Sequence, residues 1–382
     1  MLCLSALTAA VARQARRGWR GAARRDSFSL VTVEQTGATI RSVQCLRGLA
    51  ALMVVLHHLQ NQTGRLGLGH TDWSALPSGV DIFFVISGFI MWVTTASKPD
   101  RTAFSFYRDG ITRIAPLYWL ITAFLVAVLV VAPGATNTAV LDWPHIFRSL
   151  LFIPAEHPVT HAYQPTLIPG WTLNMEMFFY LLFGAAIAAG GADLRLRCRI
   201  IVPALLAIVA AGLVVRPEGL LGFYTQDMVG EFAAGILIGV AFAERRLPRS
   251  NWFWVPLVAG FVLILAPTPL ADLGSRLVRW GFPASLIVFG AVFVPQPGPA
   301  ALQRLGDWSY ALYLSHPITL AASEKAWAKL AGPLPLLLFP LAAVVAAIIA
   351  AWLIHRVAEL PLTRAARRLV QPRSPPASPL AT

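Results

Sequence analysis

Charged residues are scarce in this sequence. Asp, Glu, Lys and Arg make up 13% of its 382 residues, whereas a soluble domain carries about 25%. Hydrophobic residues account for 57%, the mean hydropathy is +0.64, and long apolar runs recur from residue 43 to residue 357. This composition excludes a soluble enzyme and a disordered protein, and it excludes a nucleic-acid binder despite a pI near 10.6. It indicates a multi-span membrane protein.

Cysteine is also rare, and its copies are scattered along the chain. Cys3, Cys45 and Cys198 form no CxxC motif and no paired spacing. The sequence therefore predicts neither a metal centre nor a disulfide framework, and no tightly bound cofactor is expected.

The apolar runs are long enough to cross a bilayer as helices. A spanning helix needs about 20 mostly apolar residues to cover a hydrocarbon core of roughly 30 Å. Ten segments approach this length, so we predict an all-α integral membrane protein with about ten transmembrane helices. The predicted spans are residues 43–60, 79–97, 113–132, 171–190, 199–215, 226–243, 253–269, 277–294, 307–324 and 334–357.

The basic residues predict the orientation of these spans. If the N-terminus is cytoplasmic, 23 of the 31 Lys and Arg residues fall in inside segments, 7 fall outside, and Arg47 lies within the first span. Loops rich in Lys and Arg remain in the cytoplasm. We therefore predict that both termini are cytoplasmic, and that the high pI largely reflects topology.

The two ends of the chain differ from the membrane domain predicted for residues 41–368. In residues 1–40, six arginines follow an apolar start, which reverses the order of a secretory signal. A disordered basic extension is favoured there, and an amphipathic surface segment is the alternative. Residues 369–382 are rich in Pro and Ser, which predicts a disordered tail.

Ionisable residues inside predicted spans are energetically costly, so each one is a candidate functional residue. In the first span, RGLAALMVVLHH places Arg47 and His58 eleven residues apart. Both side chains then share one helix face, about 16 Å apart, whereas His57 points about 100° away. The alternative is that Arg47 reaches the inner headgroups and His58 the outer interface, as ordinary anchors.

Two acidic residues are predicted in the outer half of the membrane together with His58. Asp81 begins the second span (GVDIFFVISGF), where it could instead cap the helix N-terminus. Glu176 lies about two turns inside the fourth span (WTLNMEMFFYLLF), too deep for a cap. Histidine acts as a base or nucleophile near neutral pH, and a carboxylate can orient it. Either Asp81 or Glu176 can fill that role.

Arginines are predicted on the inner side, at the depth of Arg47. Arg108 and Arg113 flank the start of the third span (FYRDGITRIAPLYW). They are either topology determinants, as cytoplasmic arginines usually are, or ligands for a polyanion through guanidinium–phosphate pairs.

Together these segments resemble the acyltransferase 3 family of membrane proteins, which O-acylate sugars and other surface or secreted molecules. The family's Arg-x10-His pattern falls on Arg47 and His58, and WTLNMEMFFY is most similar to the exopolysaccharide acetyltransferase branch. One departure is that Asp109 and Gly110 interrupt the basic run expected before the third span. The matching stretches are IRSVQCLRGLAALMVVLHH, GVDIFFVISGF, RIAPLYW, WTLNMEMFFYLLF, WSYALYLSHP and VAELPLTR.

The resemblance implies transfer of an acyl group, most simply acetyl, from cytoplasmic acyl-CoA to a sugar hydroxyl. The acceptor would be a surface polysaccharide or exopolysaccharide, or its lipid-linked precursor. Acyl-CoA is then a co-substrate, and the partners are a carbohydrate acceptor and membrane lipids, with no nucleic acid. The expected location is the inner (plasma) membrane. The candidate catalytic residues are His58, Glu176 and Asp81, and the candidate donor-binding residues are Arg47, Arg108 and Arg113.

A transporter or flippase of a lipid-linked saccharide is the competing interpretation, because charged residues can also line a transport path. The sequence shows no two-fold repeat of the kind found in many transporters, and a transporter would show no acyl-transfer chemistry.

Overall fold

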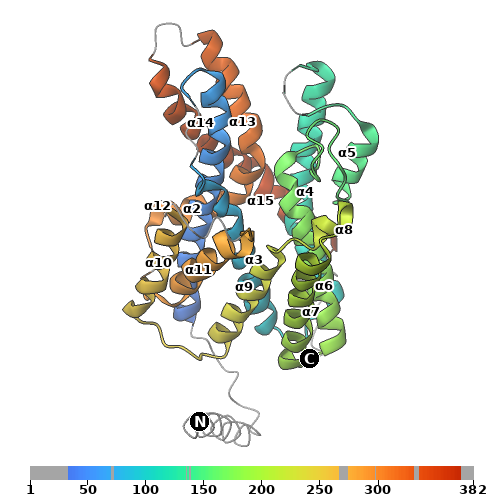
Figure 1. Ribbon diagram of the computed structural model, residues 1–382, viewed down its shortest axis with the longest axis vertical. Coiled ribbons are helices and arrows are strands. Elements are labelled where there is room, and N and C mark those ends of the chain that lie inside the picture. The colour runs from blue at the N-terminus through green and yellow to red at the C-terminus, as the bar shows by residue number, and fades with distance from the viewer. Residues whose placement is uncertain are drawn as a thin grey trace, which may run out of the picture. The chain divides into compact units, whose positions relative to one another are not determined.

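The computed structural model describes residues 33–69, 73–134, 136, 139–265, 274–296, 298–330 and 335–370. The chain divides into two units, residues 1–38 and 39–382, and the architecture below is that of the second unit. Its described residues form helices joined by loops, with one isolated β-bridge between Glu156 and Tyr163 (Figure 1). The all-α prediction is therefore confirmed for the part of the chain that the structure describes.

The helices follow one another with mostly short connections. The longer ones are α2 (Val33–Arg65), α3 (Gly79–Ala96), α4 (Ala103–Val131), α6 (Trp171–Gly190), α7 (Leu194–Val215), α9 (Val229–Ala243), α13 (Ser309–Leu330) and α14 (Phe339–Ile354). The shorter ones are α5 (Trp143–Leu150), α8 (Gly219–Tyr224), α10 (Trp254–Leu265), α11 (Phe282–Phe293), α12 (Ala300–Asp307) and α15 (Leu360–Val370). Two π-helical turns, η5 (Leu277–Gly281) and η7 (His355–Glu359), precede α11 and α15.

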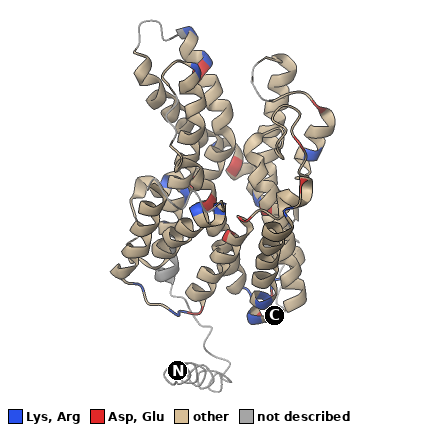
Figure 2. Ribbon diagram, viewed as in Figure 1, with Lys and Arg blue, Asp and Glu red and all other residues tan. Residues whose placement is uncertain are grey.

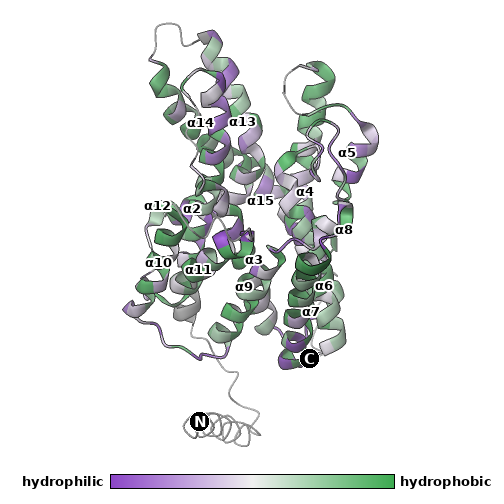
Figure 3. Cartoon of the chain, in the orientation of Figure 1, coloured by the Kyte–Doolittle hydropathy of each residue, from purple (hydrophilic) through white to green (hydrophobic). Residues whose placement is uncertain are grey.

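Among the described residues, seven helical segments are long and apolar enough to cross a membrane. They are Arg41–Arg65, Leu76–Ala96, Ala103–Val131, Ile168–Gly190, Leu194–Val215, Gly219–Ala243 and Leu336–Val370. Hydrophobic residues predominate along α6 and α7 (Figure 3), and charged residues are sparse along most helices (Figure 2). Helices are the natural outcome, because a bilayer offers the backbone no water to hydrogen-bond.

The remaining predicted spans fall on helices that do not meet the same criterion. Spans 253–269 and 277–294 correspond to the shorter apolar helices Asn251–Leu265 and Leu277–Phe293. At 1.5 Å per residue these are only about 22 and 26 Å long, less than a hydrocarbon core of about 30 Å. Residues 266–269 lie outside the described residues. Span 307–324 corresponds to α13, whose polar residues lower its hydropathy.

The predicted ends lie largely beyond the described ranges. Residues 1–32 and 371–382 are not described, so the predictions for them remain predictions. Of the predicted ends, residues 33–40 fall in α2 and residues 369–370 in α15.

Helices α3 and α9 approach closely because glycines lie between them. A Cβ atom on Gly88 would lie 2.3 Å from the carbonyl oxygen of Phe232, and one on Gly235 would lie 2.1 Å from that of Val85. Gly235 and Gly239 also have the GxxxG spacing that lets helix backbones meet in membranes. A side chain larger than hydrogen at these contacts would force the two helices apart.

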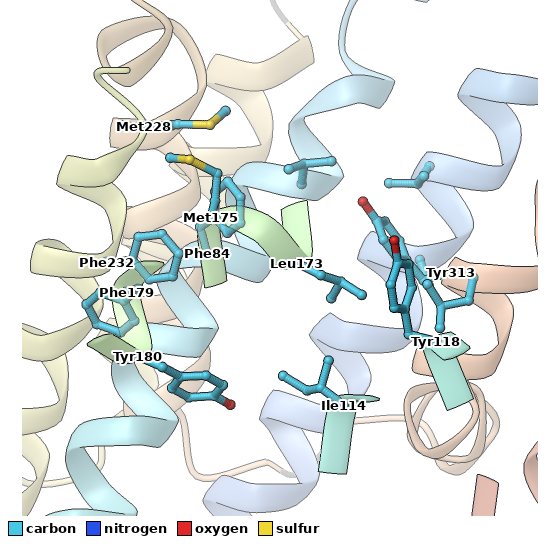
Figure 4. Close-up of a cluster of buried hydrophobic side chains, with 14 of the residues drawn as sticks. Phe84, Ile114, Tyr118, Leu173, Met175, Phe179, Tyr180, Met228, Phe232 and Tyr313 are labelled. Carbon is cyan, nitrogen blue, oxygen red and sulfur yellow. The ribbon is translucent and has the colours of Figure 1, made fainter. Parts of the chain in front are cut away.

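Aromatic rings hold α6 against this helix pair. Phe179 of α6 stacks on Phe232 of α9 with ring centroids 4.1 Å apart, and Phe84 of α3 lies 4.8 Å from Phe232. Figure 4 shows these three rings on one side of the interior and Tyr118 and Tyr313 on the other. Helix α13 packs on α14, and α4 packs on α6 and α15. Helices from distant parts of the sequence therefore surround a common interior.

Candidate active site

A cavity of about 210 Å³ lies among α2, α3, α4, α6 and α13, and is called the central cavity below. Its charged and polar lining residues are Arg47, Ser87, Arg113, Thr172, Glu176, Asp307, Ser309, Tyr310, Tyr313 and Glu359. The rest of the wall is apolar. Charged groups inside a membrane protein are costly unless they are paired or bind a ligand, so this cavity is the leading candidate site.

Arg113, Glu176 and Tyr180 form a connected group on one wall of the central cavity. Arg113 Nη2 donates to the Tyr180 hydroxyl at 2.8 Å and lies 3.4 Å from Glu176 Oε1. The Tyr180 hydroxyl in turn donates to the same Glu176 oxygen at 3.2 Å. The Arg113 side chain still keeps 47% of its surface exposed, so its guanidinium retains donors for a further ligand.

Arg47 contributes a second guanidinium to the cavity wall. Among the described residues, its one hydrogen bond runs from Nη1 to Gln44 Oε1 at 3.2 Å. A guanidinium has five N–H donors, so most of those on Arg47 are available. The structure therefore brings together two of the three arginines predicted to bind the donor.

Arg108, the third of them, lies outside the central cavity. Its Nε and Nη2 atoms both donate to Asp109 Oδ1 at 3.2 Å, and Arg101 Nη2 donates to Asp109 Oδ2 at 2.8 Å. Asp109, which interrupts the basic run in the sequence, is thus held between two guanidinium groups. Its carboxylate offsets the positive charge that a phosphate would otherwise find there.

Two histidine rings lie next to each other between α2 and α13. The ring centroids of His58 and His316 are 4.9 Å apart. His58 Nδ1 lies 2.9 Å from the carbonyl oxygen of Val54, and His316 Nδ1 lies 2.7 Å from that of Tyr313. A carbonyl only accepts hydrogen bonds, so each neutral ring carries its proton on Nδ1 and presents a lone pair on Nε2. His316 Nε2 is buried and finds no hydrogen-bond partner in the described part of the chain.

This histidine pair adjoins the central cavity through one aromatic side chain. Tyr313 lines the cavity, and its ring centroid lies 6.0 Å from that of His316. The Tyr313 hydroxyl is fixed by Thr172 Oγ1 at 2.9 Å and by the carbonyl oxygen of Pro169 at 3.2 Å. His316, a potential base, is thus separated by the Tyr313 ring from a cavity that contains two arginines.

The carboxylates predicted to orient His58 have other partners. Asp81 is fully buried and forms a two-point ion pair with Arg276, with N···O distances of 2.9 and 2.7 Å. Glu176 belongs to the arginine group of the central cavity. The carbonyl of Val54 takes the position expected for a carboxylate beside His58. A buried carboxylate needs a full opposite charge, which a guanidinium supplies and a neutral imidazole does not.

Several residues of these groups were not singled out in the sequence, although a signal for each was present. All are ionisable and lie in or beside a predicted span. His316 belongs to WSYALYLSHP and Glu359 to VAELPLTR, two stretches used only for the family resemblance. Glu231 lies inside the span 226–243, where it is fully buried close to Asp81. Charge is costly in every span of a membrane protein, so the signal that marks Arg47 and Glu176 marks these residues too.

The chemistry available here is that of imidazole, guanidinium, carboxylate and tyrosine side chains. Within the described ranges, no group of three or more His, Cys, Asp or Glu side chains could hold a metal ion. Apolar helices long enough to span a membrane, around a cavity lined by charged residues and close to a potential general base, are typical of one class: a membrane-embedded group-transfer enzyme.

The comparisons with known proteins agree with that class. The chain belongs to the acyltransferase 3 family, whose model, described as an acyltransferase domain, matches residues 40–356. It is an O-acyltransferase of the membrane type, and the resemblance noted in the sequence is confirmed.

Two relatives cover most of the chain. Exopolysaccharide production protein ExoZ of Rhizobium meliloti (strain 1021) is 33% identical over 322 residues, which are 82% of this chain and 96% of that protein. Acyltransferase MdmB of Streptomyces mycarofaciens is 25% identical over 371 residues, covering 85% and 91% respectively. No solved structure matches the chain at a significant level.

Proposed function

We propose that this enzyme transfers an acyl group, most simply acetyl, from acyl-CoA to a sugar hydroxyl of an exopolysaccharide or its lipid-linked precursor. The relative named as an exopolysaccharide production protein supports the acceptor class. The observation that carries the proposal is the position of His58, which lies against His316, the neighbour of Tyr313 in the wall of a cavity with two arginines.

The enzyme works in the inner (plasma) membrane, with about ten spans and both termini in the cytoplasm. The distribution of basic residues, 23 inside against 7 outside, supports this orientation. Reporter fusions after residues 65, 150 and 330 should report outside, and fusions after 100, 195, 248 and 375 inside. An inside signal at residue 150 would contradict the ten-span arrangement.

The donor enters from the cytoplasmic side, where its phosphates are attracted by arginine. Arg47 and Arg113 line the central cavity, and guanidinium groups match phosphate oxygens in geometry and charge. His58 lies eleven residues beyond Arg47 on the same helix, about 16 Å further along its axis. The long pantetheine arm of CoA is suited to cross that distance and present its thioester near the histidine pair.

In the reaction, His58 Nε2 removes the proton from the acceptor hydroxyl. The hydroxyl oxygen attacks the thioester carbonyl, the C–S bond breaks, and the ester forms. CoA leaves as a thiolate and takes up a proton, so the transfer is proton-neutral overall. Arg113, with its remaining donors, can stabilise anionic groups of the donor during transfer. An acyl-imidazole on His58 is the two-step version of the same chemistry.

The test uses the purified full-length enzyme in lipid nanodiscs with acetyl-labelled acetyl-CoA and an oligosaccharide acceptor. Labelled ester and free CoA thiol should appear in equal amounts. In cells, the companion measurement is the number of acyl groups per sugar repeat beside total polysaccharide. A flippase would change the amount exported and leave the acyl content of each repeat unchanged. No label on any saccharide, with intact donor binding, would contradict the proposed acceptor class.

A further inference from the structure

A second pocket, of about 710 Å³, opens beside the central cavity and is called the rim pocket here. It lies between Gln44 of α2, the helix α12, and the junction of α14 with η7. The residues that matter are Gln44, Arg304, Trp308, Trp352, His355 and Arg356. Arg304 and Arg356 belong to predicted cytoplasmic segments, and the other four lie at the predicted cytoplasmic ends of spans 43–60, 307–324 and 334–357.

The rim pocket combines exposed cations with aromatic faces. Arg304 and Arg356 are exposed and take part in no salt bridge with another described residue. The Arg356 guanidinium lies over the indole of Trp352, 5.7 Å from the ring centroid, and Trp352 is 38% exposed. Trp308 adds a second indole. Free guanidinium groups suit phosphates, and indole faces suit the stacking of a nucleobase.

Polar side chains at the base of the rim pocket separate it from the central cavity. Asp307 lines both spaces and accepts from Gln44 Nε2 at 2.8 Å. Gln44 also accepts from Arg47 of the cavity. His355 Nδ1 lies 2.8 Å from Oε2 of Glu359, another cavity residue. Hydrogen-bonded side chains therefore link the two spaces, and Asp307 belongs to the lining of both.

We propose that the rim pocket binds the adenine nucleotide end of the acyl donor, the 3′-phosphorylated ADP group of CoA. Arg304 and Arg356 bind its 3′-phosphate, and the Trp308 and Trp352 indoles receive the adenine ring. The pyrophosphate then lies toward Arg47 and Arg113, and the pantetheine arm continues past Gln44 and Asp307 into the central cavity. This inference rests on the proposed function, because it takes acyl-CoA as the donor.

A lipid phosphate is the other source of the same chemistry, since Arg and Trp commonly lie at the inner membrane interface. Two features favour the nucleotide. The residues line an open depression large enough for a nucleotide, and Gln44 and His355 provide hydrogen-bonding groups suited to base edges. The rim pocket also shares Asp307 with the cavity where the acyl end must arrive.

The test measures binding of adenosine 3′,5′-bisphosphate and of acetyl-CoA to the full-length enzyme in nanodiscs. Arg304→Ala, Arg356→Ala and Trp352→Leu should each weaken both by roughly ten- to a hundred-fold. With acetyl-pantetheine, which lacks the nucleotide, the same three variants should transfer acetyl at rates within about two-fold of wild type. Arg368→Ala is the matched control: it removes an exposed charge from α15 outside the pocket and should behave as wild type. Unchanged thermal unfolding verifies that each variant is folded.

The outcomes separate this inference from the proposed function. Wild-type use of acetyl-CoA with unchanged affinity in all three rim variants would overturn the nucleotide site alone. Binding of adenosine 3′,5′-bisphosphate by wild type, lost in the variants, would support the site even if no acyl transfer occurred. Variants that alter only the dependence of activity on phosphatidylglycerol content would identify a lipid phosphate and overturn the inference.

Discussion

The imidazole rings of His58 and His316 belong to helices near opposite ends of the chain, and their centroids lie 4.9 Å apart. Backbone carbonyls hold the proton of each neutral ring on Nδ1, which leaves the Nε2 atom of each ring as an acceptor. Two acceptors cannot hydrogen-bond each other. A hydroxyl group is the donor that this pair lacks, and the acceptor sugar brings one.

His58→Ala should abolish acylation while leaving membrane abundance unchanged. Loss of a general base typically costs a factor of 10²–10⁴ in rate, and loss of a covalent carrier costs more. The measurement is acetyl transfer by purified enzyme, with acyl groups per sugar repeat as the readout in cells. His57→Ala is the matched control and should be tolerated, because adjacent helix positions diverge by about 100°. Normal acylation per repeat in His58→Ala would exclude this histidine from the chemistry.

His316→Phe should lower kcat by about ten- to a hundred-fold, with the KM for donor changed less than two-fold. The substitution keeps a ring in the buried space and removes the Nε2 acceptor, whose hydrogen bond to a polar transition state is worth roughly 1.5–3 kcal/mol. Initial rates measured while each substrate is varied in turn separate the effect on kcat from the effect on KM. The double variant His58→Ala/His316→Phe should be scarcely slower than His58→Ala, since parts of one catalytic unit are not additive. Full activity in His316→Phe would show that His316 contributes to packing and not to catalysis.

Arg113→Ala should raise the KM for acyl-CoA by about ten- to a hundred-fold, because a guanidinium–phosphate contact in a partly dry site is worth about 1.5–3 kcal/mol. Arg113→Lys should recover only part of this, since the planar fork is gone. Arg108→Ala is the control suggested by the structure: its guanidinium is engaged by Asp109 outside the central cavity. Equal effects of the Arg108 and Arg113 variants would show that position relative to the cavity does not matter.

The sequence predicts the helices well because apolar length and charge are local properties. It also places Arg47 and His58 on one face of α2, since eleven residues return to nearly the same angle. It does not predict which helices touch. Glu176 and Arg113 meet because α4 extends back to Ala103 and runs beside α6. Asp81 meets Arg276 across a long stretch of sequence. Such pairings depend on how the helices pack. Glycines such as Gly88 and Gly235 allow close packing because a single added Cβ atom would clash with the neighbouring helix.

Removal of one partner from the buried pair Asp81–Arg276 should destabilise the fold strongly. Asp81 is fully buried, and breaking a buried ion pair typically costs about 3–5 kcal/mol because the remaining charge is left uncompensated. Asp81→Ala should therefore lower both membrane abundance and the temperature of thermal unfolding in detergent. Arg65→Ala is the control, because Arg65 pairs with Glu324 at a more exposed site, where such pairs contribute about 0–1 kcal/mol. Equal destabilisation by both variants would contradict this interpretation of burial.

The loop between α4 and α6 should open reversibly below pH 6.5. His145 and His157 are buried there with ring centroids 5.1 Å apart, and His157 Nδ1 accepts from the backbone N–H groups of Val159 and Thr160. Burial lowers the pKa of both histidines below the ordinary value of 6.5. The folded loop then binds fewer protons than the open loop, so its stability is complete above pH 6.5 and falls as the pH drops through that value.

Hydrogen exchange of the amides in residues 143–166, compared at pH 7.5 and 5.5, measures this opening. After correction for the intrinsic pH dependence of exchange, protection should be lower at pH 5.5, while peptides from α7 should be unchanged. His157→Asn offers an amide oxygen as a non-titrating acceptor for the two N–H groups and should weaken the pH dependence. Protection that is independent of pH, or that falls as the pH rises, would mean that the histidines are not the titrating groups.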